Sequence, residues 1–229
     1  MCGRIRVPED YSEIKIDLRL HEVVPHTYDP RWNVPPTAML PVVRSRDGKR
    51  ILEPMRWGLI PSWAKDAKVG FSSFNARADS LDTKPAFRRA WERGKRCLIV
   101  TDGFYEWRKA DKQPFAVALG NRGPMLMAGL YDNWKSPEGW IRSCTVITTD
   151  ANELVAGVHN RMPAILAPDD IAPWLGEEPA SPDRLKAMLR PYPPERLAMW
   201  PVDKRVGNVK NEGPELAEPL TARAQGTLL

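Results

Sequence analysis

The chain has 229 residues, of which 42% are hydrophobic and 28% are charged, as is usual for a globular protein. Lysine and arginine outnumber aspartate and glutamate by 34 to 29, so the net charge is +5, which suits an anionic partner without requiring one. No apolar run approaches the roughly 20 residues that cross a bilayer, so we expect a cytoplasmic protein rather than a membrane protein.

The second residue, Cys2, is the first chemically distinctive feature. Once the initiator methionine is removed, Cys2 carries an α-amine and a thiol on neighbouring carbons, with ordinary pKa values of about 8 and about 8.5. Such an amine condenses with an aldehyde to an imine, and the thiol can close on the imine to a five-membered thiazolidine. An internal cysteine cannot do this, because its nitrogen belongs to an amide. The alternative is an ordinary small residue in a frayed terminus.

The cysteines and histidines do not form a recognisable metal or disulfide pattern. They are scattered and contain no CxxC pair: Cys2, Cys97, Cys144, His21, His26 and His159. We therefore expect no disulfide framework, no metal and no cofactor.

Prolines and glycines, 23 and 15 of them, divide the chain into short elements. A short helix is predicted to open at Pro8, and residues 21–37 are predicted to be a loop, too proline-rich at 28–36 for regular structure. Residues 39–43 and 51–57 are predicted strands, joined through 44–50 with its Asp-Gly turn signal.

The elements that follow are also short. Strands are predicted at 97–100, 115–119, 125–131, 140–148 and 199–202, and helices at 85–93, 168–175 and 182–189, with a helix N-cap signal within 148–154. Residues 208–215 are predicted to be extended and polar. We expect one domain over residues 1–220 and a disordered tail over 221–229.

Three stretches between these elements combine chemically useful side chains. Two tryptophans flank a turn at 57–63, where they could pack in the core or offer a stacking surface to a base. Residues 71–79 mix aromatic, amide and guanidinium groups. At 102–107, Glu106 lies among three aromatic residues, so it is either a desolvated carboxylate suited to proton transfer or an outward-pointing strand residue.

His159 is the second candidate for proton transfer. It precedes Arg161 and Pro163 and so is predicted to lie in a loop, where functional residues concentrate. A lone histidine can equally be structural.

These stretches occur together in one order that resembles the SRAP family, the SOS-response-associated peptidases or abasic-site-processing proteins. The resemblance covers residues 2 to about 215 and rests on five motifs in register: Cys2-Gly3-Arg4, residues 57–63, Asn75-Ala76-Arg77, residues 102–107 and residues 159–163. It implies an α+β fold, a single compact domain with a mainly antiparallel, barrel-like core, short flanking helices and a basic DNA groove.

The resemblance also implies a function. Family members cross-link to abasic sites in single-stranded DNA, whose ring-opened sugar exposes an aldehyde. Transferred to this chain, it implies a nucleoid-associated monomer in which Cys2 forms the thiazolidine, Asn75 binds the terminus or sugar, and Glu106 and His159 move protons. Arg4, Arg77 and Arg161 would bind phosphates, and Trp63 would support a base. Many bacterial members carry a second tryptophan where this chain has Ala64, which leaves part of the stacking surface open to question.

Two other functions remain open at this point. Cys2, His159 and Asn75 could form the Cys-His-Asn set of a thiol peptidase. Its reaction would be the removal of Met1 by the protein itself. The chain could also be a noncovalent module for a modified base or single-stranded DNA, with Cys2 incidental.

Overall fold

The computed structural model describes residues 2–7, 14, 18–26 and 29–220. The helix predicted at Pro8 and the predicted tail at 221–229 lie outside these residues. The described strands are β1 Ile5–Val7, β2 Glu22–Val23, β3 Arg31–Val34, β4 Met39–Arg46, β5 Lys49–Trp57, β6 Asn75–Arg77, β7 Arg96–Thr101, β8 Gly103–Trp107, β9 Pro114–Leu119, β10 Met125–Ser136, β11 Gly139–Asp150, β12 Arg161–Pro163 and β13 Leu197–Pro201. The described helices are α2 Pro85–Glu92, α3 Glu153–Ala156, α4 Pro168–Leu175 and α5 Pro182–Met188, with 3₁₀ turns η1 Ala67–Phe71, η2 Ala78–Ser80, η3 Pro194–Arg196, η4 Lys204–Gly207 and η5 Pro214–Ala217.

Five strands close into a barrel-like ring. Antiparallel pairs join β11 to β10, β10 to β7, β7 to β4 and β4 to β5, and a parallel bridge between β5 and β11 completes the circuit. β7 pairs on both sides, and its residues 97–101 are all buried, which explains why its sequence is a continuous apolar run. The sequence prediction of an α+β domain with a mainly antiparallel, barrel-like core is confirmed.

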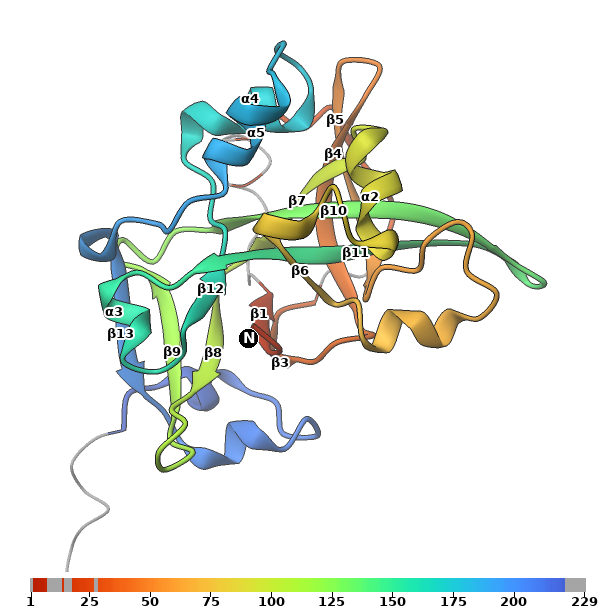
Figure 1. The fold of residues 1–229 in the computed structure, drawn as a ribbon. Helices are drawn as coiled ribbons and strands as arrows, with labels where there is room; N and C mark the ends of the chain where they lie inside the picture. The colour runs from red at the N-terminus through yellow and green to blue at the C-terminus, as the bar shows by residue number, and fades with distance from the viewer. Residues whose placement is uncertain (1, 8–13, 15–17, 27–28, 221–229) are drawn as a thin grey trace, which may run out of the picture.

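A second sheet, ordered β13-β9-β8-β1-β3, holds the N-terminal strand in its interior. β1 lies between β8 and β3, with Ile5 opposite Phe104 on one side and Val34 on the other. Figure 1 shows this sheet beside the barrel, with the start of the chain between the two. The chain at Cys2 and β1 is therefore tied into the structure, so the frayed alternative for Cys2 is wrong.

Two predictions about irregular segments are wrong. The segment 21–37 contains β2, which pairs with β5, and β3, which pairs with β1. The prolines fall outside these short strands, so backbone pairing with an existing edge overrides the proline-rich composition. The segment 208–215 is not extended throughout, because η5 begins at Pro214.

The predicted β4–β5 hairpin is confirmed, but its strands are longer than predicted. Asp47 and Gly48 have φ values of 53° and 74°, so a two-residue turn replaces the longer connection expected over 44–50.

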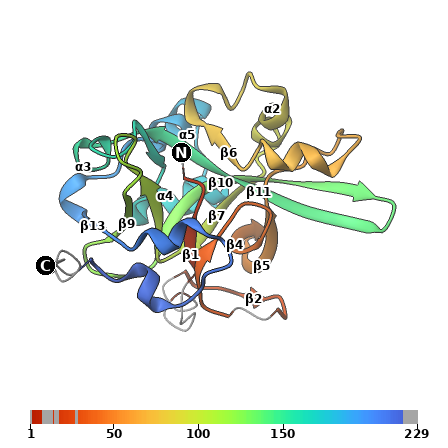
Figure 2. The same ribbon diagram turned by 90° about the horizontal axis from the view of Figure 1, so that it is seen from below.

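The helices are short and lie around the sheets (Figures 1 and 2). In α2, Phe87 and Trp91 are four residues apart and buried, which places the arginines of the same helix on its outer face. Within the described chain, no helix is long and apolar enough to cross a membrane.

Candidate active site and nucleic-acid surface

Cys2 lies in the core, with no solvent-exposed surface. Its position follows from the β1–β8 register: the backbone N–H of Tyr105 donates to the carbonyl of Arg4 at 2.9 Å, which brings the residues before β1 alongside the end of β8. The carbonyl of Cys2 accepts a hydrogen bond from the side-chain Nδ2 of Asn75 at 2.7 Å. Two separate segments, β8 and the strand that carries Asn75, therefore hold the chain at Cys2.

The side-chain amide of Asn75 has a second polar atom, its oxygen, near the start of the chain. Its side-chain Oδ1 is buried and accepts no hydrogen bond from any residue that the structure describes. β6 carries Asn75 and pairs in parallel with β11, Asn75 opposite Val146, so the amide stands on a rigid strand. An acceptor on such a strand, next to the start of the chain, suits a protonated or hydrogen-bonding ligand atom.

Glu106 is buried, with 5% of its surface exposed, so the outward-pointing alternative is wrong. It lies on β8, and its Oε1 is 3.4 Å from the backbone nitrogen of Trp107. Burial raises the pKa of the Cys2 thiol, and the nearby charge of Glu106 raises it further. The thiol is therefore neutral at physiological pH, and it feels the charge of Glu106.

His159 interacts with the same carboxylate. Burial lowers the pKa of His159, while the charge of Glu106 acts against that decrease. The Nδ1 atom accepts a hydrogen bond from the backbone N–H of Arg161 at 3.0 Å. Because Nδ1 is an acceptor, the proton of the neutral ring is on Nε2. Cys2, Asn75, Glu106 and His159 are thus brought together from four parts of the chain.

Two of the predicted arginines flank this cluster on neighbouring strands. Arg161 is buried: its Nη1 is 2.8 Å from Asp150 Oδ1, and its Nη2 donates to the carbonyl of Thr148 at 2.5 Å. Arg77 is exposed and pairs with Asp79 at 2.5 Å. β6 and β12 both pair with β11, with Arg77 opposite Thr148 and Arg161 opposite Asp150. Both arginines therefore lie near the same end of β11, with Arg77 exposed and Arg161 buried.

Arg4 lies elsewhere. Only 9% exposed, it donates through Nη1 to Asn33 Oδ1 at 2.5 Å and to the carbonyl of Val206 at 2.7 Å. Its guanidinium also stands 5.6 Å from the ring centre of Trp107. These contacts tie β1 to β3 and to the C-terminal segment.

The two tryptophans of residues 57–63 have different environments. Trp57 is fully buried and belongs to the core, whereas Trp63 is 51% exposed. Ala64, which follows it, is 8% exposed and packs with Ile60 and Trp134. Position 64 is therefore a buried support in this chain, and of the residues at 57–64 it is Trp63 that presents an exposed aromatic ring.

Comparison with known proteins identifies the family. The model of the SOS response associated peptidase (SRAP) family matches residues 1–209. This chain belongs to the SRAP family. Among its relatives, the abasic site processing protein YoqW of Bacillus subtilis is 38% identical over 223 residues, covering 95% of this chain and 99% of that protein. The abasic site processing protein HMCES of Gallus gallus is 36% identical over 227 residues, covering 84% of this chain and 67% of its own length.

Solved structures agree with the SRAP assignment of the fold. A protein from Bacteroides thetaiotaomicron superposes with a TM-score of 0.85 and 25% identity, covering 96% of this chain and all of that one. A protein from Bordetella bronchiseptica gives a TM-score of 0.75 and 26% identity over 88% of this chain and all of its own.

Several residues that shape the SRAP site escaped the sequence analysis. Asp150 and Asp79 hold the two arginines, and Asn33 anchors the guanidinium of Arg4 while donating to the carbonyls of Asn208 and Asn211. The pairing of Asp79 with Arg77 could have been predicted from the sequence, because the two residues are only two positions apart. The others are distant in sequence from their partners and gave no signal.

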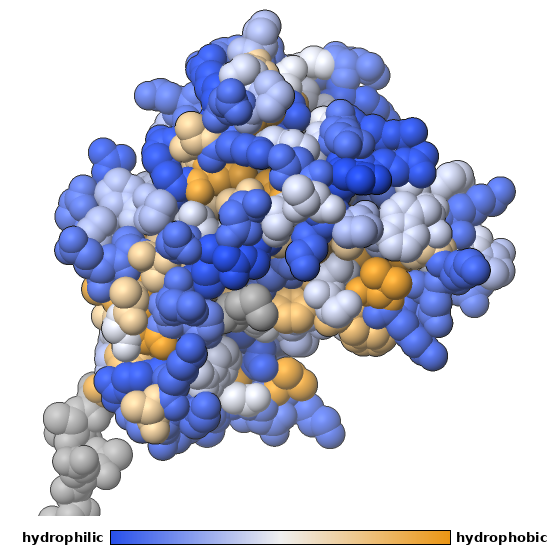
Figure 3. All heavy atoms as spheres, viewed as in Figure 1, coloured by the Kyte–Doolittle hydropathy of each residue, from blue (hydrophilic) through white to orange (hydrophobic). Residues whose placement is uncertain are grey.

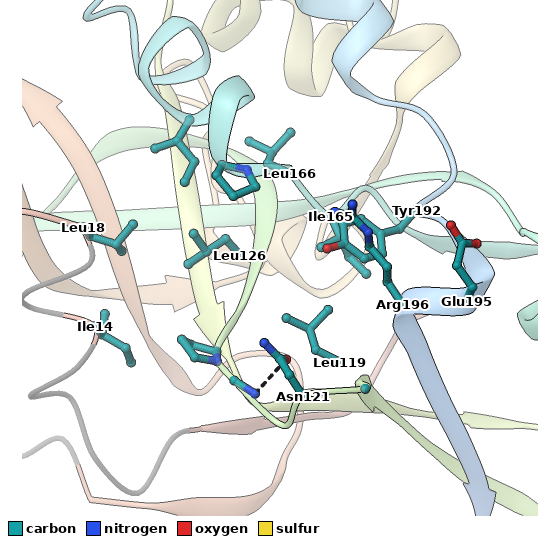
Figure 4. A pocket seen from close by; sticks show the side chains of 15 residues that line it. Ile14, Leu18, Leu119, Asn121, Leu126, Ile165, Leu166, Tyr192, Glu195 and Arg196 are labelled. Atoms are coloured by element: carbon teal, nitrogen blue, oxygen red, sulfur yellow. Dashed lines mark hydrogen bonds between the residues drawn. The ribbon is translucent and has the colours of Figure 1, made fainter.

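A cavity of about 770 Å³ lies away from this site (Figure 4). Its walls are mostly apolar and include Ile14, Leu126, Leu166 and Tyr192. None of the eight predicted site residues lines it, so we assign the cavity no part in the chemistry at Cys2.

Proposed function

We propose that this SRAP protein recognises abasic sites in single-stranded DNA and cross-links to them through Cys2. The observation that carries the proposal is the convergence of Asn75, Glu106 and His159 on the N-terminal residue. The named activity of its relatives, abasic site processing, supplies the substrate. An abasic sugar in its open form carries an aldehyde, which is the electrophile that an amine beside a thiol can capture as a ring.

The reaction begins after Met1 has been removed. The free α-amine of Cys2 attacks the aldehyde carbon, and the resulting carbinolamine loses water to give an imine. Sγ then bonds to the imine carbon, while the thiol proton passes to the nitrogen. One water leaves overall, and the product is a thiazolidine that resists hydrolysis better than the imine and so shields the lesion from strand cleavage.

The surrounding residues have distinct roles in this proposal. Asn75 positions the backbone of Cys2 through Nδ2 and offers Oδ1 to the amine or the sugar. Glu106 takes the thiol proton during ring closure and passes it to the nitrogen, and it carries the proton back during reversal, because its charge acts on that thiol. His159, neutral because burial lowers its pKa, assists opening of the sugar ring through Nε2.

Arg77 binds the DNA backbone, because it is exposed and already oriented by Asp79. Arg161 and Arg4 have supporting roles, because both are buried and their terminal nitrogens are used within the protein. Arg161 holds Asp150 and Thr148, and Arg4 holds Asn33 and Val206. Trp63 supports a base beside the lesion.

The thiol peptidase alternative is less well supported. A peptidase needs a thiolate, which a neighbouring cation or helix N-terminus stabilises by lowering the thiol pKa. Here burial and Glu106 raise the pKa of Cys2. This environment suits a neutral thiol that adds to an imine after the amine has reacted.

The direct test is intact-mass measurement of the protein alone and after incubation with single-stranded DNA that contains one abasic site. We expect a protein without Met1, and then an adduct heavier by the DNA less one water. Cys2→Ala keeps the amine and should give only a labile imine that borohydride traps. A variant with an uncleaved residue ahead of Cys2 should give no adduct. Efficient cross-linking by that blocked protein would refute the mechanism.

A further inference from the structure

A shallow groove of about 600 Å³ lies between the exposed turn at Trp63 and the outer face of α2. Its lining contains one aromatic and several charged side chains: Trp63, Pro85, Arg88, Arg89, Glu92 and Arg93. Since Phe87 and Trp91 face the core, the charged residues of α2 point outward into this groove. None of the residues around Cys2 lines it.

The groove has an excess of positive charge. Three arginines face a single glutamate, and the closest approach between Arg88 and Glu92 is 3.9 Å, a loose exposed pair. Among the residues that the structure describes, no carboxylate forms an ion pair with Arg89 or Arg93. Unlike Arg77 and Arg161, these two guanidiniums have no described acidic partner, so they suit an anion from outside the chain.

The aromatic wall of the groove is held firmly although it is exposed. The backbone N–H of Ser62 donates to Asp132 Oδ2 at 2.8 Å, and the indole N–H of Trp134 donates to the carbonyl of Ala64 at 2.6 Å. Asp132 is buried and paired with Lys95. These contacts lock the residues on both sides of Trp63, so stacking on its ring requires little further ordering of the backbone.

The groove and the proposed lesion site are linked by β6 and the segment that follows it. β6 carries Asn75 at the site and Arg77 beyond it, and the chain runs from β6 through η2 directly into α2. In two perpendicular views, β6 lies between the start of the chain and α2 (Figures 1 and 2). Figure 3 shows hydrophilic side chains gathered over α2 on this face.

We propose that this groove, formed by Trp63 with Arg88, Arg89 and Arg93, binds the single-stranded DNA that flanks the lesion on one side. The base next to the lesion stacks on Trp63, and the following phosphates lie along the arginines of α2. An aromatic face beside unneutralised guanidiniums is the combination that single strands require, because bases stack while phosphates need cations. This inference rests on the proposed function and adds a second contact region, separate from the chemistry.

The test uses single-stranded oligonucleotides with one tetrahydrofuran abasic analogue, which has no aldehyde and so reports binding alone. The flank is extended from three to nine nucleotides on the 5′ side or on the 3′ side. Wild-type affinity should rise at least tenfold for one of the two extensions. Arg89→Ala combined with Arg93→Ala should remove most of that gain and reduce the slope of log affinity against log salt by about 1.4.

Two further variants separate stacking from charge. Trp63→Ala should weaken binding about 5- to 150-fold with an unchanged salt slope. Arg184→Ala combined with Lys49→Ala is the matched control. It removes two exposed positive charges from α5 and the β4–β5 turn, which lie at the top of Figure 1 and do not line the groove, and it should retain the gain. The proposal is overturned if neither extension raises wild-type affinity, or if the Arg89 and Arg93 variant keeps the gain as this control does.

A separate experiment tests the proposed cross-linking function, so that its failure can be distinguished from failure of the groove proposal. This function is tested on short oligonucleotides with a true abasic aldehyde, where both the wild type and the Arg89 and Arg93 variant should form the same adduct. Absence of any wild-type adduct would reject the cross-linking function, whatever the groove binds. A normal adduct without the flank effect would reject only the groove.

Discussion

The Cys2 site and the groove between Trp63 and α2 are built on opposite principles. At Cys2, the reacting residue and Glu106 are buried, and hydrogen bonds and buried charges shift pKa values. In the groove, Trp63 and the arginines are exposed, and only the supporting turn is buried. A reaction requires groups that are held in place and shielded from water. Binding of a flexible single strand requires aromatic rings and charges that are accessible to it. Variants in the first region should change rates, and variants in the second should change affinity.

The largest expected effect comes from Glu106→Gln, which removes the carboxylate and keeps its size. Loss of the proton acceptor should slow cross-linking by about 10²- to 10⁴-fold, measured in single-turnover gels with saturating DNA. Affinity for the tetrahydrofuran analogue should stay unchanged. Glu138→Gln, at the exposed tip of the β10–β11 hairpin, is the matched control. Cross-linking by Glu106→Gln at the wild-type rate would contradict a role of this residue in proton transfer.

Asn75→Ala should have the next largest effect. It removes the hydrogen bond to the Cys2 carbonyl, so a buried acceptor loses its partner at a cost of about 1–3 kcal/mol in unfolding free energy. A terminus free to shift should cross-link about 10- to 100-fold more slowly. Urea unfolding and single-turnover kinetics measure the two effects. Asn75→Asp, which keeps the size and loses the donor, should behave similarly; wild-type kinetics in Asn75→Asp would contradict the positioning role.

Asp132→Asn tests the support of the groove. The variant removes the charge that faces Lys95 and weakens the acceptor for Ser62, so it should lower stability by about 1–2 kcal/mol. We expect a weaker flank contribution to affinity, several-fold, with the cross-linking rate at saturating DNA unchanged. Replacing Lys95 by methionine in the same protein should recover part of the stability. A slower rate at saturation would show that the two regions are not independent.

The smallest effect concerns His159 and pH. Burial lowers its pKa below the ordinary value of about 6.5, so the folded protein binds this proton less tightly than the unfolded chain does. Stability from this residue is therefore present above about pH 6.5 and decreases as the pH falls through that value. His159→Gln removes the effect, so its Tm should fall less between pH 7.5 and 5.5, by about 1–2 °C. Parallel Tm profiles would argue against a lowered pKa.

The sequence by itself determined a good part of this protein. The apolar run of β7, the spacing of Phe87 and Trp91 and the Asp47-Gly48 turn predicted elements that the structure confirms, because each depends on local geometry. The motifs around Cys2, Asn75, Glu106 and His159 indicated the SRAP family before any fold was known. These residues carry their chemistry in their side chains, so their types were informative without coordinates.

Tertiary structure decided the rest. Whether Glu106 faced the core or water depended on which side of β8 packs, and periodicity left both open. β3 formed inside a proline-rich segment because β1 offered an edge, which no local propensity encodes. Arg4 and Arg161 were both assigned to phosphates, but their partners Asn33 and Asp150 differ in place and charge. Contacts between residues distant in the chain fix burial, charge and orientation, and these decide which side chain reacts, which binds and which only supports.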